Sequence, residues 1–204
     1  MTTKETLLSI TPDTAFQLLK EGNQRFSSGN IPKRNFTSEL SESSKYPAPF
    51  AVVIACMDSR TSPELVMDQG LGDIFSLRVA ANFIDDDVLG SIEFAAAIAG
   101  VKIVLILGHN DCRAIGGACD DVKLGSFTNF LKKLKTSINK TKTEGERNSS
   151  NAEFVTDVAI TNVNEGLNTI RQSSVIRELI ENGSIKVTGG MYNTETGKIK
   201  FFEE

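Results

Sequence analysis

The sequence predicts an α/β fold with a mostly parallel sheet of four strands, an added edge strand at the carboxyl terminus and flanking helices. Two apolar runs, residues 50–55 and 101–107, have the length and the abrupt ends of buried parallel strands. Segments with helical periodicity alternate with strands, which is typical of a parallel sheet with right-handed crossovers. The closing segment, residues 185–201, reads as two strands around a turn and supplies the edge strand.

The first structural signal along the chain is a helix. Thr11 is a suitable cap, Pro12 suits the first turn, and apolar residues at helical spacing continue to Phe26. We expect this helical arm, about residues 11–30, to pack on its own core or on a partner subunit. Residues 31–49 contain prolines and a serine-rich stretch, and are expected to form a loop with at most one short helical turn.

The middle of the chain alternates between strands and helices. Ser62 and Pro63 open a short helix, and residues 74–80 form the next strand. Residues 85–99 predict a strong helix, because acidic side chains in its first turn favour the helix dipole and Gly100 ends it. After the strand at 101–107 we expect a helix start at 114–121, a helix at 124–138, a mobile polar loop at 140–150, and helices at 152–171 and 175–182.

Composition indicates one globular domain, residues 1–204, with an ample core, since the chain has 204 residues and is 40% apolar. The net charge of −4 provides no basic field for a phosphate backbone, so nucleic acid is not expected as a partner. No apolar run is long enough to cross a bilayer, and no membrane partner is expected. The amino-terminal residues lack the pattern of a secretory signal, so we expect a cytoplasmic protein.

The cysteines favour metal binding or catalysis over a disulfide framework. Their number is three, which is odd, and no secretory signal accompanies them. Cys119 is expected to be buried as a small apolar residue. The other two cysteines each follow one of the apolar strands.

Polar side chains follow both of these strands. Cys56 ends the first strand and precedes Asp58 and Arg60, and His109 and Cys112 follow the second. Adjacent parallel strands that end this way bring two thiolates and one imidazole together in a cleft, across about 5 Å. Zinc prefers such ligands, although iron or cobalt fit them as well. Taken alone, Cys-x-Asp-x-Arg more often indicates a buried thiol beside a surface ion pair.

The two motifs together, CMDSR at 56–60 and HNDC at 109–112, resemble those of the β-class carbonic anhydrases of bacteria. The likeness runs from about Thr11 to Phe201. It also includes the segments LLKEGNQRF, DQGLGDIFSLRVAANF, LGSIEFAAAIAG, GACDDVKLG and GGMYNTETGKIKF.

The resemblance implies that Cys56, His109 and Cys112 bind zinc. It implies that Asp58 and Arg60 are the family's catalytic aspartate and arginine. In that arrangement Asp58 accepts a hydrogen bond from the water on the zinc, or becomes the fourth ligand in a closed state when Arg60 does not hold it away. Two thiolates weaken zinc as a Lewis acid, so help from Asp58 is expected.

The resemblance also implies an activity: reversible hydration of carbon dioxide to bicarbonate and a proton by a zinc lyase, a carbonate dehydratase. The substrate is a small molecule, and the assembly implied is a homodimer or a larger even homo-oligomer. Arg113, Ala81 and Asn82 would line the substrate pocket. If His109, the only histidine, binds the metal, none remains to carry protons, so turnover is expected to depend on buffer.

Three departures from the family pattern bear on activity. Arg113 stands where glycine is usual, and an ungapped count places Pro47 where many members have a glutamine. The chain has no tryptophan, so the regulatory bicarbonate site of one subgroup is missing, although Arg78 matches a family arginine. Two alternatives therefore stay open. One is a reshaped pocket for another small substrate, such as carbon disulfide or carbonyl sulfide, and the other is a catalytically weak protein with a binding or regulatory role.

Overall fold

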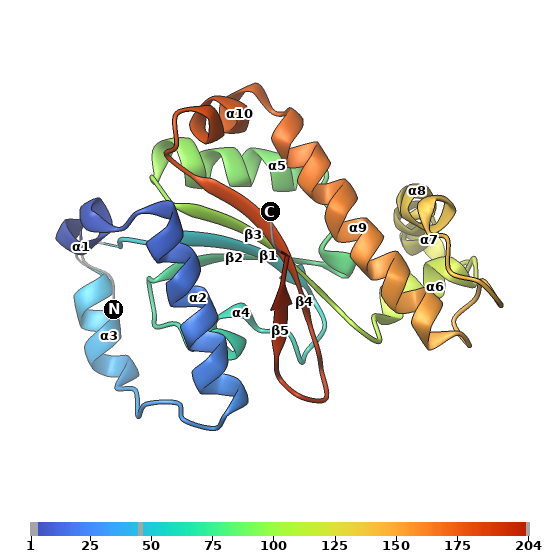
Figure 1. The fold of residues 1–204 in the computed structure, drawn as a ribbon, viewed down its shortest axis with the longest axis horizontal. Helices are drawn as coiled ribbons and strands as arrows, with labels where there is room; N and C mark the ends of the chain where they lie inside the picture. Colours follow the sequence, from blue (N-terminus) through green and yellow to red (C-terminus); the bar gives the residue numbers. More distant parts are fainter. Residues whose placement is uncertain (1–3, 45–46, 203–204) are drawn as a thin grey trace.

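The computed structural model describes residues 4–44 and 47–202 and contains one five-stranded sheet (Figure 1). The strand order is β2-β1-β3-β4-β5. The first four strands in that order pair in parallel and β5 pairs antiparallel to β4, which confirms the predicted sheet and its edge strand. The strands are β1 (Ala51–Cys56), β2 (Ile74–Val79), β3 (Ile103–His109), β4 (Lys186–Tyr192) and β5 (Ile199–Phe201).

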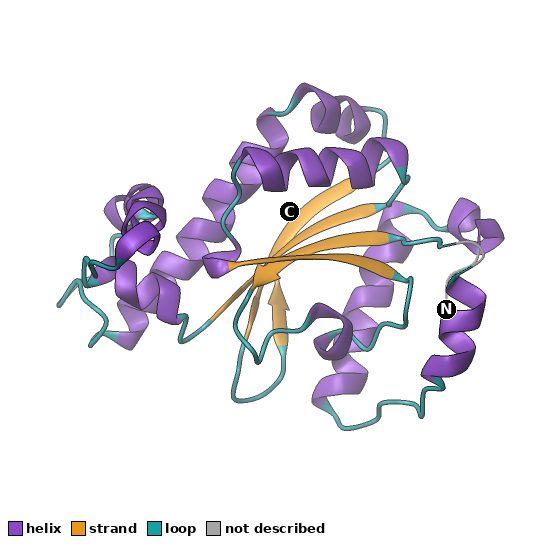
Figure 2. Ribbon diagram, turned by 180° about the vertical axis from the view of Figure 1, so that it is seen from behind, coloured by secondary structure: helices purple, strands orange, loops and turns teal. Residues whose placement is uncertain are grey.

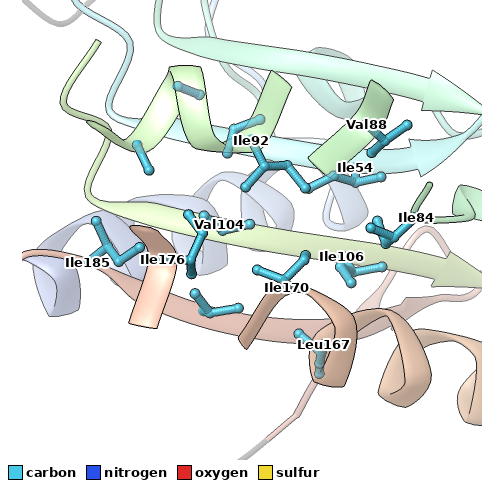
Figure 3. Close-up of a cluster of buried hydrophobic side chains, with 14 of the residues drawn as sticks. Ile54, Ile84, Val88, Ile92, Val104, Ile106, Leu167, Ile170, Ile176 and Ile185 are labelled. Atoms are coloured by element: carbon cyan, nitrogen blue, oxygen red, sulfur yellow. The ribbon is translucent and has the colours of Figure 1, made fainter. Parts of the chain in front are cut away.

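Helices cover both faces of the sheet (Figure 2). On one face, α5 (Asp86–Glu93), α9 (Ala152–Gln172) and α10 (Ser174–Glu181) enclose the cluster that includes Ile54 and Ile106 (Figure 3). On the other face, α2 (Pro12–Ser27) and α4 (Pro63–Val66) pack over Val53 and Leu105. Alternate residues of β1 and β3 therefore serve opposite cores, which is why both strands are apolar throughout.

A third apolar cluster lies beyond the carboxyl ends of the strands. It joins Cys56 and Cys112 to side chains of α6 (Arg113–Cys119), α7 (Gly125–Lys133), α8 (Lys135–Lys140) and the start of α9. Figure 1 shows these three shorter helices gathered at one end of the molecule. Buried apolar side chains therefore pack against Cys56 and Cys112.

Helix α2 packs on the sheet of its own chain, which is one of the two expectations for the amino-terminal arm. Thr11 caps it by accepting a hydrogen bond from the Thr14 backbone N–H at 3.2 Å. Asn23 donates to the carbonyls of Val66 and Gly197 at 2.9 and 2.8 Å, and its Oδ1 accepts from the N–H of Ile199 at 2.8 Å. This one side chain links α2 to α4 and to the β4–β5 hairpin.

Several predicted boundaries need correction. The predicted loop 31–49 contains a two-turn helix, α3 (Phe36–Ser43), capped by Asn35, and a further short helix, α1 (Lys4–Ser9), precedes α2. The expected helix at 124–138 is broken at Leu134 into α7 and α8, and the helix at 85–99 ends in a π-helical turn, Phe94–Ile98.

The strand expected at 101–107 is also shifted. β3 begins at Ile103 and continues through Gly108 to His109, because these two residues pair with Met191 and Tyr192 of β4. His109 is therefore the last residue of a strand rather than part of the loop after it. The pairing with β4 fixes the backbone position of His109 and therefore the point from which its imidazole extends.

The polar segment 140–150, expected to be mobile, is tied to its surroundings. Arg147 donates to the carbonyls of Ile138 and Thr141 at 2.6 and 3.0 Å and lies over the ring of Phe154 at 4.6 Å.

Within residues 4–44 and 47–202, no helix has both the length and the apolar character needed to cross a bilayer.

Candidate metal centre

The carboxyl ends of β1 and β3 bring three predicted metal ligands together. Cys56 ends β1, His109 ends β3, and Cys112 precedes the first residue of α6. Their side-chain ligand atoms all lie within 4.8 Å of one another, and the two sulfur atoms are 3.9 Å apart. All three side chains are buried. Because β1 and β3 are adjacent parallel strands, the sheet itself sets this convergence.

The imidazole of His109 is held in one orientation. Its Nδ1 lies 2.8 Å from the carbonyl oxygen of Asn110, which can only accept, so Nδ1 carries the proton. The other nitrogen, Nε2, is buried and has no hydrogen-bond partner among the described residues. A lone pair left free in this way, with the second nitrogen bonded to a carbonyl, is what a histidine metal ligand needs. The residues present therefore fit a metal ion.

The two thiols influence each other strongly. A hydrogen bond from Cys112 lowers the pKa of Cys56 below its usual range. The same contact, together with burial, raises the pKa of Cys112. Two buried sulfur atoms at 3.9 Å cannot both be thiolates without a positive charge between them. A divalent cation would supply that charge and let both ionise.

Asp58 and Arg60 form a bidentate pair beside these ligands. Arg60 Nε and Nη2 donate to the two carboxylate oxygens of Asp58, each at 2.9 Å, and the Arg60 backbone N–H also donates at 2.9 Å. These bonds hold the pKa of the Asp58 carboxyl well below its usual range. The Asp58 carboxylate is turned to Arg60, and among the described residues only Cys56, His109 and Cys112 form a metal-capable group.

Side chains from neighbouring elements fix the turn that carries this pair. Arg78, on β2, donates to the carbonyls of Cys56 and Asp58 at 3.2 and 2.5 Å. The Thr61 hydroxyl bonds to the same two carbonyls at 2.8 and 3.0 Å. Sequence reasoning noted Arg78 only as a family match and did not identify Thr61, although a threonine directly after the motif was a signal for a side-chain cap on this turn.

Two predicted pocket residues lie at the same edge of the sheet. Ala81 and Asn82 follow β2 in a short 3-10 turn and have positive φ values of 52° and 45°, a conformation that costs free energy for residues other than glycine. Ala81 packs in the cluster with Cys56 and Cys112. Asn82 is buried, and its Nδ2 is without a hydrogen-bond partner in the part of the chain that the structure describes.

Arg113 is the first residue of α6, directly after Cys112. Its backbone is helical and its φ is not positive, so this position does not need the conformational freedom of glycine. The side chain is exposed and lines a cavity of about 580 Å³ together with Asn110, Cys112 and Thr156.

Pro47 lies elsewhere in the chain. It is exposed and precedes the first residue of β1, whereas Cys56 ends that strand. The six residues of β1 span about 17–20 Å, so within one chain Pro47 and the metal group lie at opposite ends of this strand. Cys119, expected to be buried, is half-buried and lies outside the metal group.

Comparisons with known proteins agree with this geometry. Residues 51–199 match the family model described as carbonic anhydrase. The chain is 32% identical over 193 residues to carbonic anhydrase 2 of Mycobacterium tuberculosis, covering 92% of this chain and 91% of that protein. It is 30% identical to carbonic anhydrase of Mycolicibacterium smegmatis, covering 93% and 92%.

Solved structures give the same result. A β-carbonic anhydrase of Aspergillus fumigatus, CafA, superposes with a TM-score of 0.74 at 26% identity, covering 94% of this chain and 90% of that one. A structure described among two tetrameric β-carbonic anhydrases of Sordaria macrospora gives 0.72 at 26%, covering 94% and 98%. With the family model matched over residues 51–199, which include the four parallel strands, and both relatives covered almost end to end, the chain belongs to the β-carbonic anhydrase family.

Proposed function

We propose that this protein catalyses the zinc-dependent, reversible hydration of carbon dioxide to bicarbonate and a proton. As a member of the carbonic anhydrase family it is an enzyme of the carbonate dehydratase class, a lyase. The observation that carries the proposal is the buried group of Cys56, His109 and Cys112, whose ligand atoms lie within 4.8 Å of one another. Among the described residues, Nε2 of His109 has no hydrogen-bond partner. The bidentate Asp58–Arg60 pair stands beside this group.

The donor set favours zinc. Two thiolates and one neutral imidazole are typical zinc ligands, and three protein ligands leave one coordination position for chemistry. When bound, zinc acts as a Lewis acid that lowers the pKa of water toward neutrality, so that hydroxide is available to attack carbon dioxide. The family and the ligand chemistry support zinc over the iron or cobalt that would also fit, and metal analysis decides between them.

Each neighbouring residue has a definite role in this proposal. Asp58 is ionised and accepts a hydrogen bond from the attacking water, and Arg60 fixes the direction of that carboxylate with its planar fork. The Asn110 carbonyl keeps the proton of His109 on Nδ1. Since His109 is the only histidine, protons leave through Asp58, ordered water and external buffer.

We place Arg113, Ala81 and Asn82 around the substrate. Ala81 and Asn82 follow β2 at the edge that carries Cys56, and Arg113 follows Cys112. The helical backbone at Arg113 accommodates arginine in place of glycine, which supports carbon dioxide as the substrate. Arginine in place of glycine keeps the backbone N–H and adds a side chain at a cavity.

We also propose a single domain that assembles as a homodimer or a larger even oligomer in the cytoplasm. All three apolar clusters of the described residues include side chains of the one sheet. β2 is an edge strand, its Phe75 and Leu77 are half-buried, and Phe94 and Ile98 nearby are exposed, which suits a subunit contact. Metal-binding thiols need a reducing compartment.

A matched pair of cysteine variants tests the proposal. Cys112→Ser should lose most of its zinc, measured per chain by elemental analysis, together with carbon dioxide hydration measured by stopped flow. Cys119→Ser is the control, because Cys119 is a free thiol outside the metal group. It should keep both zinc and activity. Full zinc and full activity in Cys112→Ser would refute the site.

A further inference from the structure

Arg60 has a second carboxylate partner, Asp111, which lies between the candidate ligands His109 and Cys112. Arg60 Nη1 donates to Asp111 Oδ2 at 3.0 Å, and Nη2 lies 3.3 Å from the Asp111 carbonyl oxygen. The same guanidinium holds Asp58 through Nε and Nη2. It therefore bridges two loops, the one that follows β1 and the one that follows β3, and each loop adjoins a cysteine of the metal group.

The backbone conformation and the exposure of Asp111 indicate what its contact with Arg60 does. Its φ is 51°, in the left-handed region, which aspartate tolerates better than most residues. The Asp111 side chain is 69% exposed and that of Arg60 is 39% exposed. An ion pair this exposed adds little to the free energy of unfolding. Its main effect is on the direction in which the guanidinium points.

We propose that Asp111 is a positioning residue that acts through Arg60. With Nη1 fixed by Asp111, the guanidinium stays in the plane in which it grips both oxygens of Asp58. Rotation about the Nε–Cζ bond, or a swing of Asp58 and Arg60 as a unit toward the cysteines, requires the bonds to Asp111 to break. Asp111 thus keeps the Asp58 carboxylate out of the metal position. The inference rests on the proposed function of this site.

The variants follow from the backbone. Asp111→Gly removes the carboxylate and suits a positive φ, and Asp111→Asn keeps an acceptor of the same shape without its charge. Asp121→Gly is the matched control. Asp121 also has a positive φ, 52°, is 61% exposed and pairs with Lys123, but it lies beyond the far end of α6 from Cys112.

The first readout is the ¹⁵N NMR spectrum of the Arg60 guanidinium in the zinc-loaded protein, assigned with Arg60→Lys. In the wild type, Nη1 and Nη2 have different carboxylate partners, so two slowly exchanging signals are expected. Asp111→Gly should speed their exchange, Asp111→Asn should lie between the two, and Asp121→Gly should match the wild type. Unchanged exchange in Asp111→Gly would overturn the proposal.

The second readout is kinetic. Asp111→Gly should keep its zinc and lower kcat for carbon dioxide hydration by about 1.5- to 5-fold at unchanged KM, as expected for an exposed ion pair. In an Arg60→Ala background the same change should have no effect. An equal loss in both backgrounds, or a loss of zinc from Asp111→Gly, would refute action through Arg60. If the zinc-loaded wild type does not hydrate carbon dioxide, the proposed function fails, while the NMR comparison still decides the role of Asp111.

Discussion

Replacing Arg60 with alanine isolates the contribution of the guanidinium that holds Asp58. The substitution removes both side-chain donors to the Asp58 carboxylate, each at 2.9 Å, and leaves the backbone N–H of residue 60 in place. The cysteines and the histidine of the metal group are unchanged. The variant therefore separates orientation of Asp58 from metal binding.

The size of the effect follows from exposure and from position. The Arg60 side chain is 39% exposed and that of Asp58 is 13% exposed, so losing the pair should cost about 1 kcal/mol or less in the free energy of unfolding. Loss of a partner that orients a group beside a metal typically lowers activity about 10- to 100-fold. Turnover should therefore fall far more than stability.

The assay combines stopped-flow hydration with zinc content per chain. Arg60→Ala should retain zinc and lose turnover, and Arg60→Lys, which keeps the charge but not the planar fork, should recover only part of it. Arg177→Ala, an exposed arginine on α10, is the control and should behave as the wild type. Loss of zinc in step with turnover, or undiminished turnover, would refute this reasoning.

The same variant has a pH signature. Arg60 lowers the pKa of Asp58 in the folded protein, so the pair adds stability at pH values above the unfolded carboxyl pKa of about 3.9. That contribution is lost as pH falls through the lower pKa of the folded state. The difference in the free energy of unfolding between wild type and Arg60→Ala, measured in urea, should therefore be constant near neutrality and shrink in acid.

Three further predictions concern packing, thiol chemistry and proton transfer. Gly22→Ala should destabilise the fold by about 3 kcal/mol or more, because the added Cβ would lie 1.8 Å from the Met67 carbonyl oxygen. The control Gly90→Ala, with open space around it in α5, should be neutral or stabilising by up to about 1 kcal/mol. Equal thermal unfolding temperatures for the two variants would contradict this prediction. Burial raises the pKa of Cys119 to about 11, so the rate of iodoacetamide labelling of the zinc-loaded protein should rise with a midpoint near that pH. A midpoint at about 8.5 would instead show an exposed thiol. The contribution of the protonated thiol to the free energy of unfolding is present below the unfolded pKa and is lost as pH rises through the folded pKa. Turnover at saturating carbon dioxide should increase with buffer concentration, since no histidine besides His109 can carry the proton, and a rate independent of buffer would argue for an internal carrier.

The metal group was predictable because its determinants are local. An apolar run marks each strand, the polar motif follows it, and adjacency of parallel strands completes the geometry. The order of the helices and the antiparallel edge strand were predictable for the same reason. The resemblance to a family then assigned roles that no spacing could assign.

The missed features depend on contacts between distant residues. β3 extends to His109 because Gly108 and His109 pair with β4, and neither residue is apolar enough to signal a strand. Helix α3 has no buried residue, and its two large apolar side chains, Phe36 and Leu40, are exposed, so no core-facing pattern marks it. The break at Leu134 has no glycine or proline, and it occurs where that side chain is fully buried in tertiary packing. The contact between Arg60 and Asp111 joins residues 51 positions apart.

The most direct test is stopped-flow carbon dioxide hydration by the fully zinc-loaded protein at about pH 8.5, where water on the metal would be mostly ionised. An Arg113→Gly variant is measured beside it, because Arg113 lies next to Cys112 at the cavity. Rapid hydration by the wild type, with the variant within a few-fold, is the expected result. A zinc-loaded wild type that is inactive, with activity appearing in Arg113→Gly, would contradict the proposed function and assign Arg113 to another substrate.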